Sequence, residues 1–200
     1  MAKQVGFLEE PVKKERIKSP SVSNHLNATV RERVKRVKLL MLDVDGVLTD
    51  GRLFYHDDGT ESKAFDVQDG HGIKLLQRAG IETVLISGRR SPSVDKRAAD
   101  LGIKEAFQGV KNKVALIEQI ASKRGLKLEE IAFVGDDLLD LPVMKRVGFA
   151  VAVSNASEYL FDVAHYMTVA PGGRGAVREV TELILGVQGM WDQVAGRYFE

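Results

Sequence analysis

Two aspartates, Asp43 and Asp45, directly follow the apolar run Leu39-Leu40-Met41-Leu42. The run predicts a buried strand, and residues two apart in a strand share a face, so both carboxylates should point the same way. Two such charges repel each other and are costly to bury unless a cation lies between them. The pair therefore indicates a Mg²⁺-assisted phosphoryl-transfer site, with one carboxylate as nucleophile and the other as proton carrier.

Further polar groups lie where later strands should end or later helices should begin. They are Ser87 and Arg89 in a Ser-Gly-Arg turn, then Lys113, then the pair Asp136 and Asp137. Each alone has an ordinary structural explanation, such as a turn or a helix cap. In an open parallel sheet, however, ligands bind outside the carboxyl ends of the strands. We therefore expect these groups and the first aspartate pair to converge on one crevice.

The elements that must position these groups alternate between strand and helix signals. This alternation predicts an α/β fold with a Rossmann-like, doubly wound parallel sheet covered on both faces. The Asp57-Asp58-Gly59 turn predicts a short β-hairpin flap over 52–65, and Asp69 is expected to cap the helix that follows. We expect strands near 37–44, 82–86, 105–108, 131–134, 149–153 and 165–169, and helices near 71–78, 94–101, 114–123, 138–147 and 176–185.

Length and composition fit one domain with two tails. The chain has 200 residues, no cysteine, and no apolar run near the roughly 18 residues of a membrane span. No apolar signal core lies near the start, so we expect a cytoplasmic protein. We divide it into a basic, flexible extension over 1–36, a catalytic domain over 37–186 and a tail over 187–200. The tail residues Trp191 and Phe199 could belong to the core, but a subunit interface is favoured because the last helix leaves little of the domain for them to cover.

The amino-terminal segment is basic, whereas the whole chain is nearly neutral. Residues 1–38 hold ten Lys or Arg against four Asp or Glu, while the net charge of the chain is +1. A basic leader can contact nucleic acid or an acidic surface. This one lacks interleaved aromatic residues and any nucleic-acid motif, which favours a solvated extension.

Taken in order, Asp43–Thr49, Ser87–Arg89, Lys113 and Gly135–Asp140 resemble the four motifs of the haloacid dehalogenase (HAD) superfamily. Only the short hairpin lies between the first motif and the next helix, so the chain resembles the branch without a cap domain. The segments 65–73 and 172–179 are similar to segments distinctive of sugar-acid phosphatases in that branch. The resemblance covers about three quarters of the chain and excludes the basic leader.

The resemblance implies a role for each motif. Asp43 would attack phosphorus to form an aspartyl-phosphate, and Asp45 would first protonate the leaving oxygen and then activate water. Lys113 and Ser87 would bind phosphoryl oxygens. Mg²⁺ would be held by the Asp43 carboxylate, the Asp45 backbone carbonyl and Asp136.

The resemblance also implies a substrate, 3-deoxy-D-manno-octulosonate 8-phosphate (KDO 8-phosphate), hydrolysed in lipopolysaccharide biosynthesis. A sialic-acid-like 9-phosphate is the alternative within the same fold. Cationic side chains suit such substrates because they carry a carboxylate besides the phosphate. The residues implied to contact substrate are Asp45, Asp66, Val67, Gln68, Asp69, Gly70, Lys74, Arg89, Arg97, Lys113 and Asp137.

Members of the capless branch are tetramers in which neighbouring chains close the site, so the resemblance implies a homotetramer with no nucleic-acid or membrane partner. Apolar Leu53, Phe54 and Tyr55 on the hairpin agree with this. Two hypotheses that place the chain in another functional class stay open. One is a non-catalytic HAD module used for oligomerisation. The other is a phospho-receiver domain, which the serine ending the strand at Ser87 disfavours.

Overall fold

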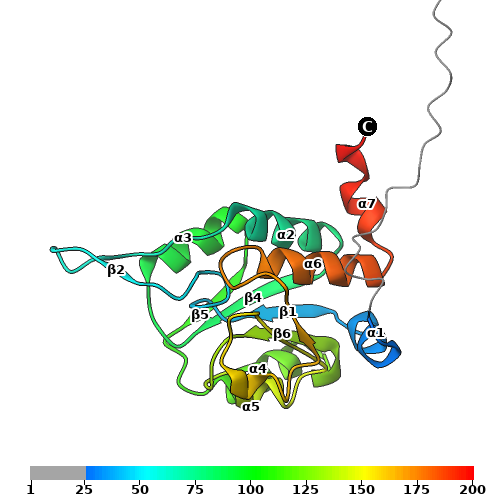
Figure 1. Cartoon of the computed structure of the whole chain (residues 1–200), viewed down its shortest axis with the longest axis horizontal. Coiled ribbons are helices and arrows are strands. Elements are labelled where there is room, and N and C mark those ends of the chain that lie inside the picture. Colours follow the sequence, from blue (N-terminus) through cyan, green and yellow to red (C-terminus); the bar gives the residue numbers. More distant parts are fainter. Residues whose placement is uncertain (1–25) are drawn as a thin grey trace, which may run out of the picture.

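The computed structural model describes residues 26–200, and its centre is a six-stranded, fully parallel sheet in the order β5-β4-β1-β6-β7-β8 (Figure 1). Strand β1 lies in the middle and every one of its residues is buried, because helices cover both faces. The strands are β1 (Leu39–Leu42), β4 (Glu82–Ser87), β5 (Glu105–Gln108), β6 (Ile131–Gly135), β7 (Phe149–Ala152) and β8 (Tyr166–Met167).

Helices α2, α3 and α6 lie on one face of the sheet, and α4 and α5 lie on the other (Figure 1). Two apolar clusters, one for each face, confirm the predicted doubly wound α/β architecture. In the part of the chain that the structure describes, no helix has the length and apolarity needed to cross a bilayer. The helices are α1 (Ala28–Lys35), α2 (Val67–Arg78), α3 (Pro92–Leu101), α4 (Lys113–Arg124), α5 (Leu141–Met144), α6 (Ala176–Val187) and α7 (Trp191–Ala195), with 3-10 turns η2 (Leu128–Glu130), η3 (Glu158–Leu160) and η4 (Gly196–Tyr198).

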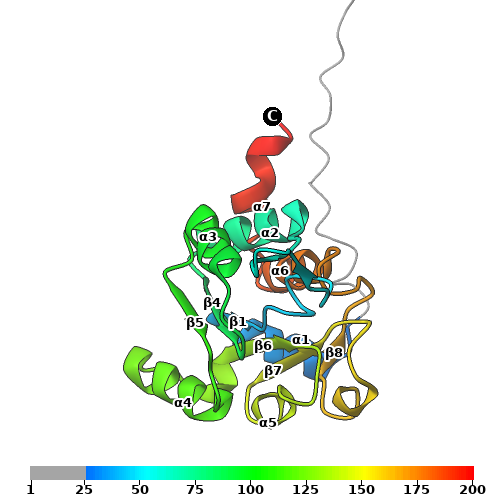
Figure 2. The same cartoon turned by 90° about the vertical axis from the view of Figure 1, so that its left-hand side faces the viewer.

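The hairpin is a separate two-stranded antiparallel unit, β2 (Phe54–Tyr55) paired with β3 (Glu61–Ser62). It leaves the body of the molecule beyond the carboxyl end of β1, and it faces the viewer in Figure 2. The same edge holds the residues that follow β4 and β6 and the first turn of α4. All the elements expected to carry polar site residues therefore end or begin on the side of the molecule from which the hairpin projects.

Both ends of the domain differ from the expected boundaries. Helix α1 lies inside the segment predicted to be a flexible extension, yet its Val30 and Val34 are buried in the core. The folded domain thus includes residues from Ala28 onward, and residues 1–25 of the predicted extension lie outside the described residues. In the tail, Trp191 is buried in the same cluster of its own chain. The prediction that Trp191 is covered by a neighbouring subunit is therefore wrong, whereas Phe199 is 65% exposed.

The first turn of α2 also corrects a predicted role. Asp66, not Asp69, caps this helix, and its carboxylate accepts hydrogen bonds from the backbone N–H groups of Gln68 and Asp69. The Asp69 carboxylate is fully buried and accepts from the backbone N–H groups of Gly175 and Arg178 at the start of α6. Asp69 therefore joins two helices.

Candidate active site

The loop after β1 is folded so tightly that its backbone contacts the loop after β6. The backbone N–H groups of Leu48 and Thr49 both donate to the Val44 carbonyl. Gly46 has φ +91°, and a Cβ atom there would lie 1.9 Å from an oxygen of Asp136. Only glycine allows both this left-handed conformation and this approach.

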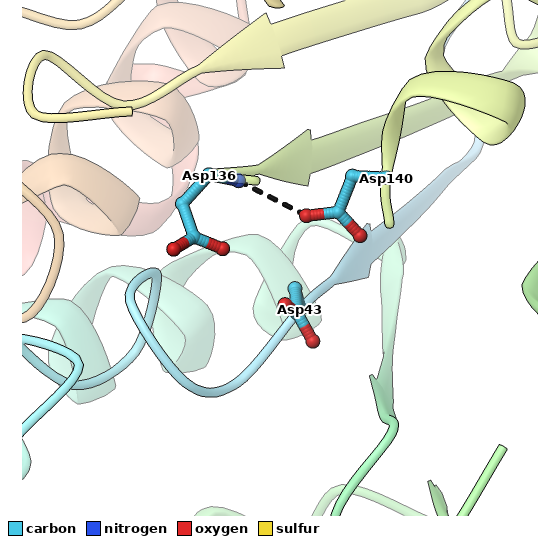
Figure 3. A group of neighbouring side chains, drawn as sticks. All are labelled: Asp43, Asp136 and Asp140. Atoms are coloured by element: carbon cyan, nitrogen blue, oxygen red, sulfur yellow. Dashed lines mark hydrogen bonds between the residues drawn. The ribbon is translucent and has the colours of Figure 1, made fainter. Parts of the chain in front are cut away.

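Three carboxylates meet at this point. Oxygens of Asp43, Asp136 and Asp140 lie within 4.8 Å of one another. Figure 3 shows Asp43 at the end of β1, below the other two, which come from the loop after β6. A hydrogen bond of 3.0 Å from the Asp136 backbone N–H to Asp140 closes that loop. The predicted convergence of the first and last motifs is therefore present in the folded chain.

Lys113 supplies positive charge to this group. Its ammonium lies 2.7 Å from Asp140 and 3.0 Å from Asp43, and the lysine side chain is 7% exposed. Burial opposes its charge, but Asp140 and Asp43 outweigh burial and hold the pKa of Lys113 above its ordinary value. Lys113 is thus positively charged at neutral pH and lies in the first turn of α4, beside the nucleophile candidate.

One lysine does not balance three carboxylates. Burial and the neighbouring Asp140 raise the pKa of Asp43 to about 6. Burial and the Asp43 charge raise the pKa of Asp136 to about 8. Hard carboxylate oxygens that repel one another in a partly buried site are the donors that a divalent cation such as Mg²⁺ requires. The residues present therefore fit a bound cation.

Asp45 points to a different neighbour. Its Oδ1 accepts from the ammonium of Lys63, and its Oδ2 lies 3.4 Å from the Ser87 hydroxyl. Asp45 is therefore placed beside the metal-ligand candidates while its own carboxylate faces the hairpin and β4. Ser87 also accepts a hydrogen bond of 3.1 Å from the Arg89 backbone N–H, which fixes the turn after β4.

Arg89, predicted to contact substrate, holds the hairpin in this structure. Its guanidinium lies 3.0 Å from Glu61 and 3.3 Å from the Tyr55 hydroxyl, and its side chain is 46% exposed. These contacts draw β2 and β3 toward the turn after β4.

Some of the other predicted substrate contacts are accessible to solvent. Asp66, Val67 and Gln68 lie at the start of α2, where Val67 is 80% exposed. The exposed carboxylate of Asp137 accepts from the Leu138 backbone N–H, as at a turn. Solvent can reach these residues.

Four other predicted contacts take part in packing within the chain, and their contact with substrate stays a prediction. The Asp69 carboxylate is buried against α6, as described above. Arg97 donates to the Asp66 carbonyl at 2.7 Å, and a Cβ on buried Gly70 would lie 2.3 Å from that guanidinium. The Lys74 ammonium lies beside Gly102, which ends α3.

The sequence gives Asp140 only a secondary role, orienting Lys113 or the metal's waters, with a cap or surface role as the equal alternative, and it gives Lys63 no role at the site. Asp140 is fully buried and binds both Lys113 and the backbone of the Asp136 loop. The position of Asp140 within the last motif indicates a role at the site, but a helix cap would explain an aspartate there equally well. Lys63 lies 18 positions from Asp45, and no sequence pattern links the two.

A parallel sheet with this carboxylate and lysine group at the carboxyl ends of its strands fits a hydrolase of the haloacid dehalogenase class, and the profile of haloacid dehalogenase-like hydrolases matches residues 105–171. The chain is 44% identical to 3-deoxy-D-manno-octulosonate 8-phosphate phosphatase from Escherichia coli, over 86% of this chain and 92% of the relative. The chain therefore belongs to the KDO 8-phosphate phosphatase family, a family of phosphoric monoester hydrolases, as the motifs predicted.

Solved structures agree. The enzyme from Moraxella catarrhalis, in complex with magnesium ion, phosphate ion and KDO, superposes with a TM-score of 0.83 at 42% identity, covering 84% of this chain and 97% of that one. The enzyme from Yersinia pestis gives a TM-score of 0.81 at 42% identity, covering 82% and 89%. These likenesses extend over nearly the whole length of both relatives.

Proposed function

We propose that this chain is a Mg²⁺-dependent phosphatase that hydrolyses KDO 8-phosphate to KDO and phosphate, as a step of lipopolysaccharide biosynthesis. The observation that carries the proposal is the meeting of Asp43, Asp136, Asp140 and Lys113 at one edge of the sheet. A non-catalytic module has no need to keep this charged group buried.

Mg²⁺ would be held by the carboxylates of Asp43 and Asp136 and the backbone carbonyl of Asp45. When bound, it supplies positive charge that offsets the repulsion between these carboxylates and a phosphate dianion. The buried Asp140 orients Lys113 and the Asp136 loop, and so acts through its neighbours.

In the first half-reaction, an oxygen of Asp43 forms a bond to phosphorus while the bond from phosphorus to the sugar oxygen breaks. Asp45 gives its proton to that leaving oxygen. Lys113 and the Ser87 hydroxyl donate to phosphoryl oxygens and stabilise the charge that builds up on them.

In the second half-reaction, a water molecule gives a proton to Asp45, and the water oxygen forms a bond to phosphorus. The bond from phosphorus to Asp43 breaks, which releases phosphate and restores the carboxylate. Asp45 ends with the proton it began with, so the cycle balances.

Selection of the sugar acid would depend on the exposed groups around the hairpin. We assign Arg89 to the sugar carboxylate, which it can hold through two parallel hydrogen bonds once it exchanges its partner Glu61. The backbone and side chains of Asp66, Val67 and Gln68 are the other candidates on the same side.

A homotetramer would complete the site by covering the exposed apolar side chains at the strand ends that carry it. Large apolar side chains are exposed near this edge, including Phe54, Tyr55 and Leu139, at 52%, 67% and 73%. Light scattering coupled to size exclusion tests this assembly: a mass near four chains is expected, and a monomer at working concentration contradicts it.

A phosphate-release panel tests the activity. KDO 8-phosphate, sialic acid 9-phosphate and hexose phosphates are compared with and without Mg²⁺. We expect the highest kcat/KM for KDO 8-phosphate and no turnover without a divalent ion. Preference for the 9-phosphate would change the substrate, whereas absence of turnover on every ester would refute the proposed function.

A further inference from the structure

We propose that Lys63 is a positioning residue of this enzyme: its ammonium holds Oδ1 of the Asp45 carboxyl group, which orients Oδ2 to carry the proton exchanged with the leaving oxygen. The inference rests on the proposed role of Asp45 as proton carrier. Lys63 immediately follows β3, so it belongs to the hairpin, whereas Asp45 follows β1.

The burial of Lys63 is the first observation. Its side chain is 0% exposed, although lysine normally keeps its ammonium in water. A buried ammonium is costly unless it is paired. Its nitrogen contacts Asp45 Oδ1 and lies 3.6 Å from Glu61 Oε1. The hairpin therefore brings a charged group inward specifically to these two carboxylates.

The second observation is that Asp45 is fixed at one oxygen, while the other has only a long contact. Lys63 contacts Oδ1, and the Ser87 hydroxyl lies 3.4 Å from Oδ2. The Asp45 side chain is 21% exposed, so without Lys63 it can rotate toward water. Because a misplacement of about 1 Å can lower a rate about 10²-fold, a group that fixes this carboxylate affects the chemical step.

The competing explanation is that Lys63 only fastens the hairpin. Glu61 binds both Lys63 and, at 3.0 Å, the guanidinium of Arg89. Through these contacts the hairpin is tied to the ends of β1 and β4. Loss of Lys63 would then displace the hairpin as a whole, and kcat/KM would fall equally for every substrate.

The test separates these explanations by the leaving group. p-Nitrophenolate departs without a proton, whereas the alkoxide of KDO 8-phosphate requires one. The comparison uses kcat/KM, which covers only the steps up to departure of the leaving group. We expect Lys63→Met to lower kcat/KM for KDO 8-phosphate at least about tenfold more than for p-nitrophenyl phosphate, since a positioned proton donor contributes about 10²–10⁴-fold. Lys63→Arg should restore most of the difference.

Two reference variants make each outcome decisive. Asp45→Asn should discriminate between the esters in the same direction and more strongly. Ser62→Ala, which removes the 2.7 Å hydrogen bond to His56 within the hairpin without touching Asp45, Glu61 or Arg89, should change both values alike. If Lys63→Met also lowers both alike while Asp45→Asn discriminates, Lys63 only fastens the hairpin and the inference is wrong. If Asp45→Asn itself fails to discriminate, the proposed role of Asp45 is refuted and the inference falls with it. Should circular dichroism show that Lys63→Met is unfolded, Lys63→Gln takes its place under the same criteria.

Discussion

Replacement of Lys113 by methionine is the perturbation whose cost the structure defines most directly. Methionine keeps an unbranched side chain of similar length but removes the ammonium that pairs with Asp140 at 2.7 Å and Asp43 at 3.0 Å. Asp140 is fully buried, so its charge would be left without its cationic partner inside the protein. Asp43 would lose the charge that partly offsets its burial.

Removal of one partner from a buried ion pair destabilises a protein by about 3–5 kcal/mol. For a domain of 150–250 residues, 1 kcal/mol corresponds to about 2–4 °C in Tm, so we expect a loss of roughly 6–20 °C. Addition of Asp140→Asn removes the stranded charge. The double variant should therefore be more stable than Lys113→Met by about 2 kcal/mol, the cost of an unsatisfied buried group.

Urea unfolding with EDTA at pH 8 measures these free energies of unfolding without any contribution from metal. Lys104→Met is the matched control, because Lys104 pairs with Glu82 at 2.9 Å while its side chain is 80% exposed. An exposed pair is worth at most about 1 kcal/mol. A loss below about 1 kcal/mol in Lys113→Met, or further destabilisation on adding Asp140→Asn, would show that the charge balance described for this site is wrong.

Three further predictions follow from the same group of residues. Gly46→Ala should lower both the Mg²⁺ affinity, measured by calorimetry, and the activity by at least about tenfold, because the new Cβ would collide with Asp136. Gly59→Ala is the control: Gly59 has φ +81° but nothing within 4 Å of a Cβ, so both quantities should stay near wild type. In the metal-free protein, the raised pKa values of Asp43 and Asp136 stabilise the fold below pH 4, and this stabilisation is lost as the pH rises toward 8. The increase in Tm on adding Mg²⁺ should therefore be larger at pH 8 than at pH 5.5. An equal increase at both pH values would contradict the raised pKa values. Asp43→Asn should abolish turnover of every phosphate ester while the far-ultraviolet spectrum stays native; residual turnover above a hundredth of wild type would argue against covalent catalysis.

The sequence predicted the sheet well because its signals are local. Apolar runs such as Leu39–Leu42 and Ile131–Val134 end in polar residues, and parallel connectivity alone brings those ends to one edge. The meeting of Asp43 with Asp136 therefore needed no knowledge of side-chain contacts. Glycines after α3 and α4 likewise marked where those helices end.

What could not be predicted depends on contacts between distant segments. The burial of Asp69 against α6 joins residues more than a hundred positions apart. The docking of α1 and of Trp191 depends on apolar area that only the assembled domain offers. From the sequence, Lys63 is an ordinary hairpin lysine, and only the folded chain brings its ammonium to Asp45.

The most direct test of covalent catalysis by Asp43 uses the Asp45→Asn variant with p-nitrophenyl phosphate. The first half-reaction of this ester needs no proton donor, whereas hydrolysis of the aspartyl-phosphate lacks its base, so the intermediate should accumulate. Rapid mixing should give a burst of p-nitrophenol equal to the enzyme concentration. Borohydride reduction of the acid-quenched protein should convert Asp43, and no other aspartate, to homoserine. Turnover without a burst, or a label on any residue but Asp43, would contradict the account.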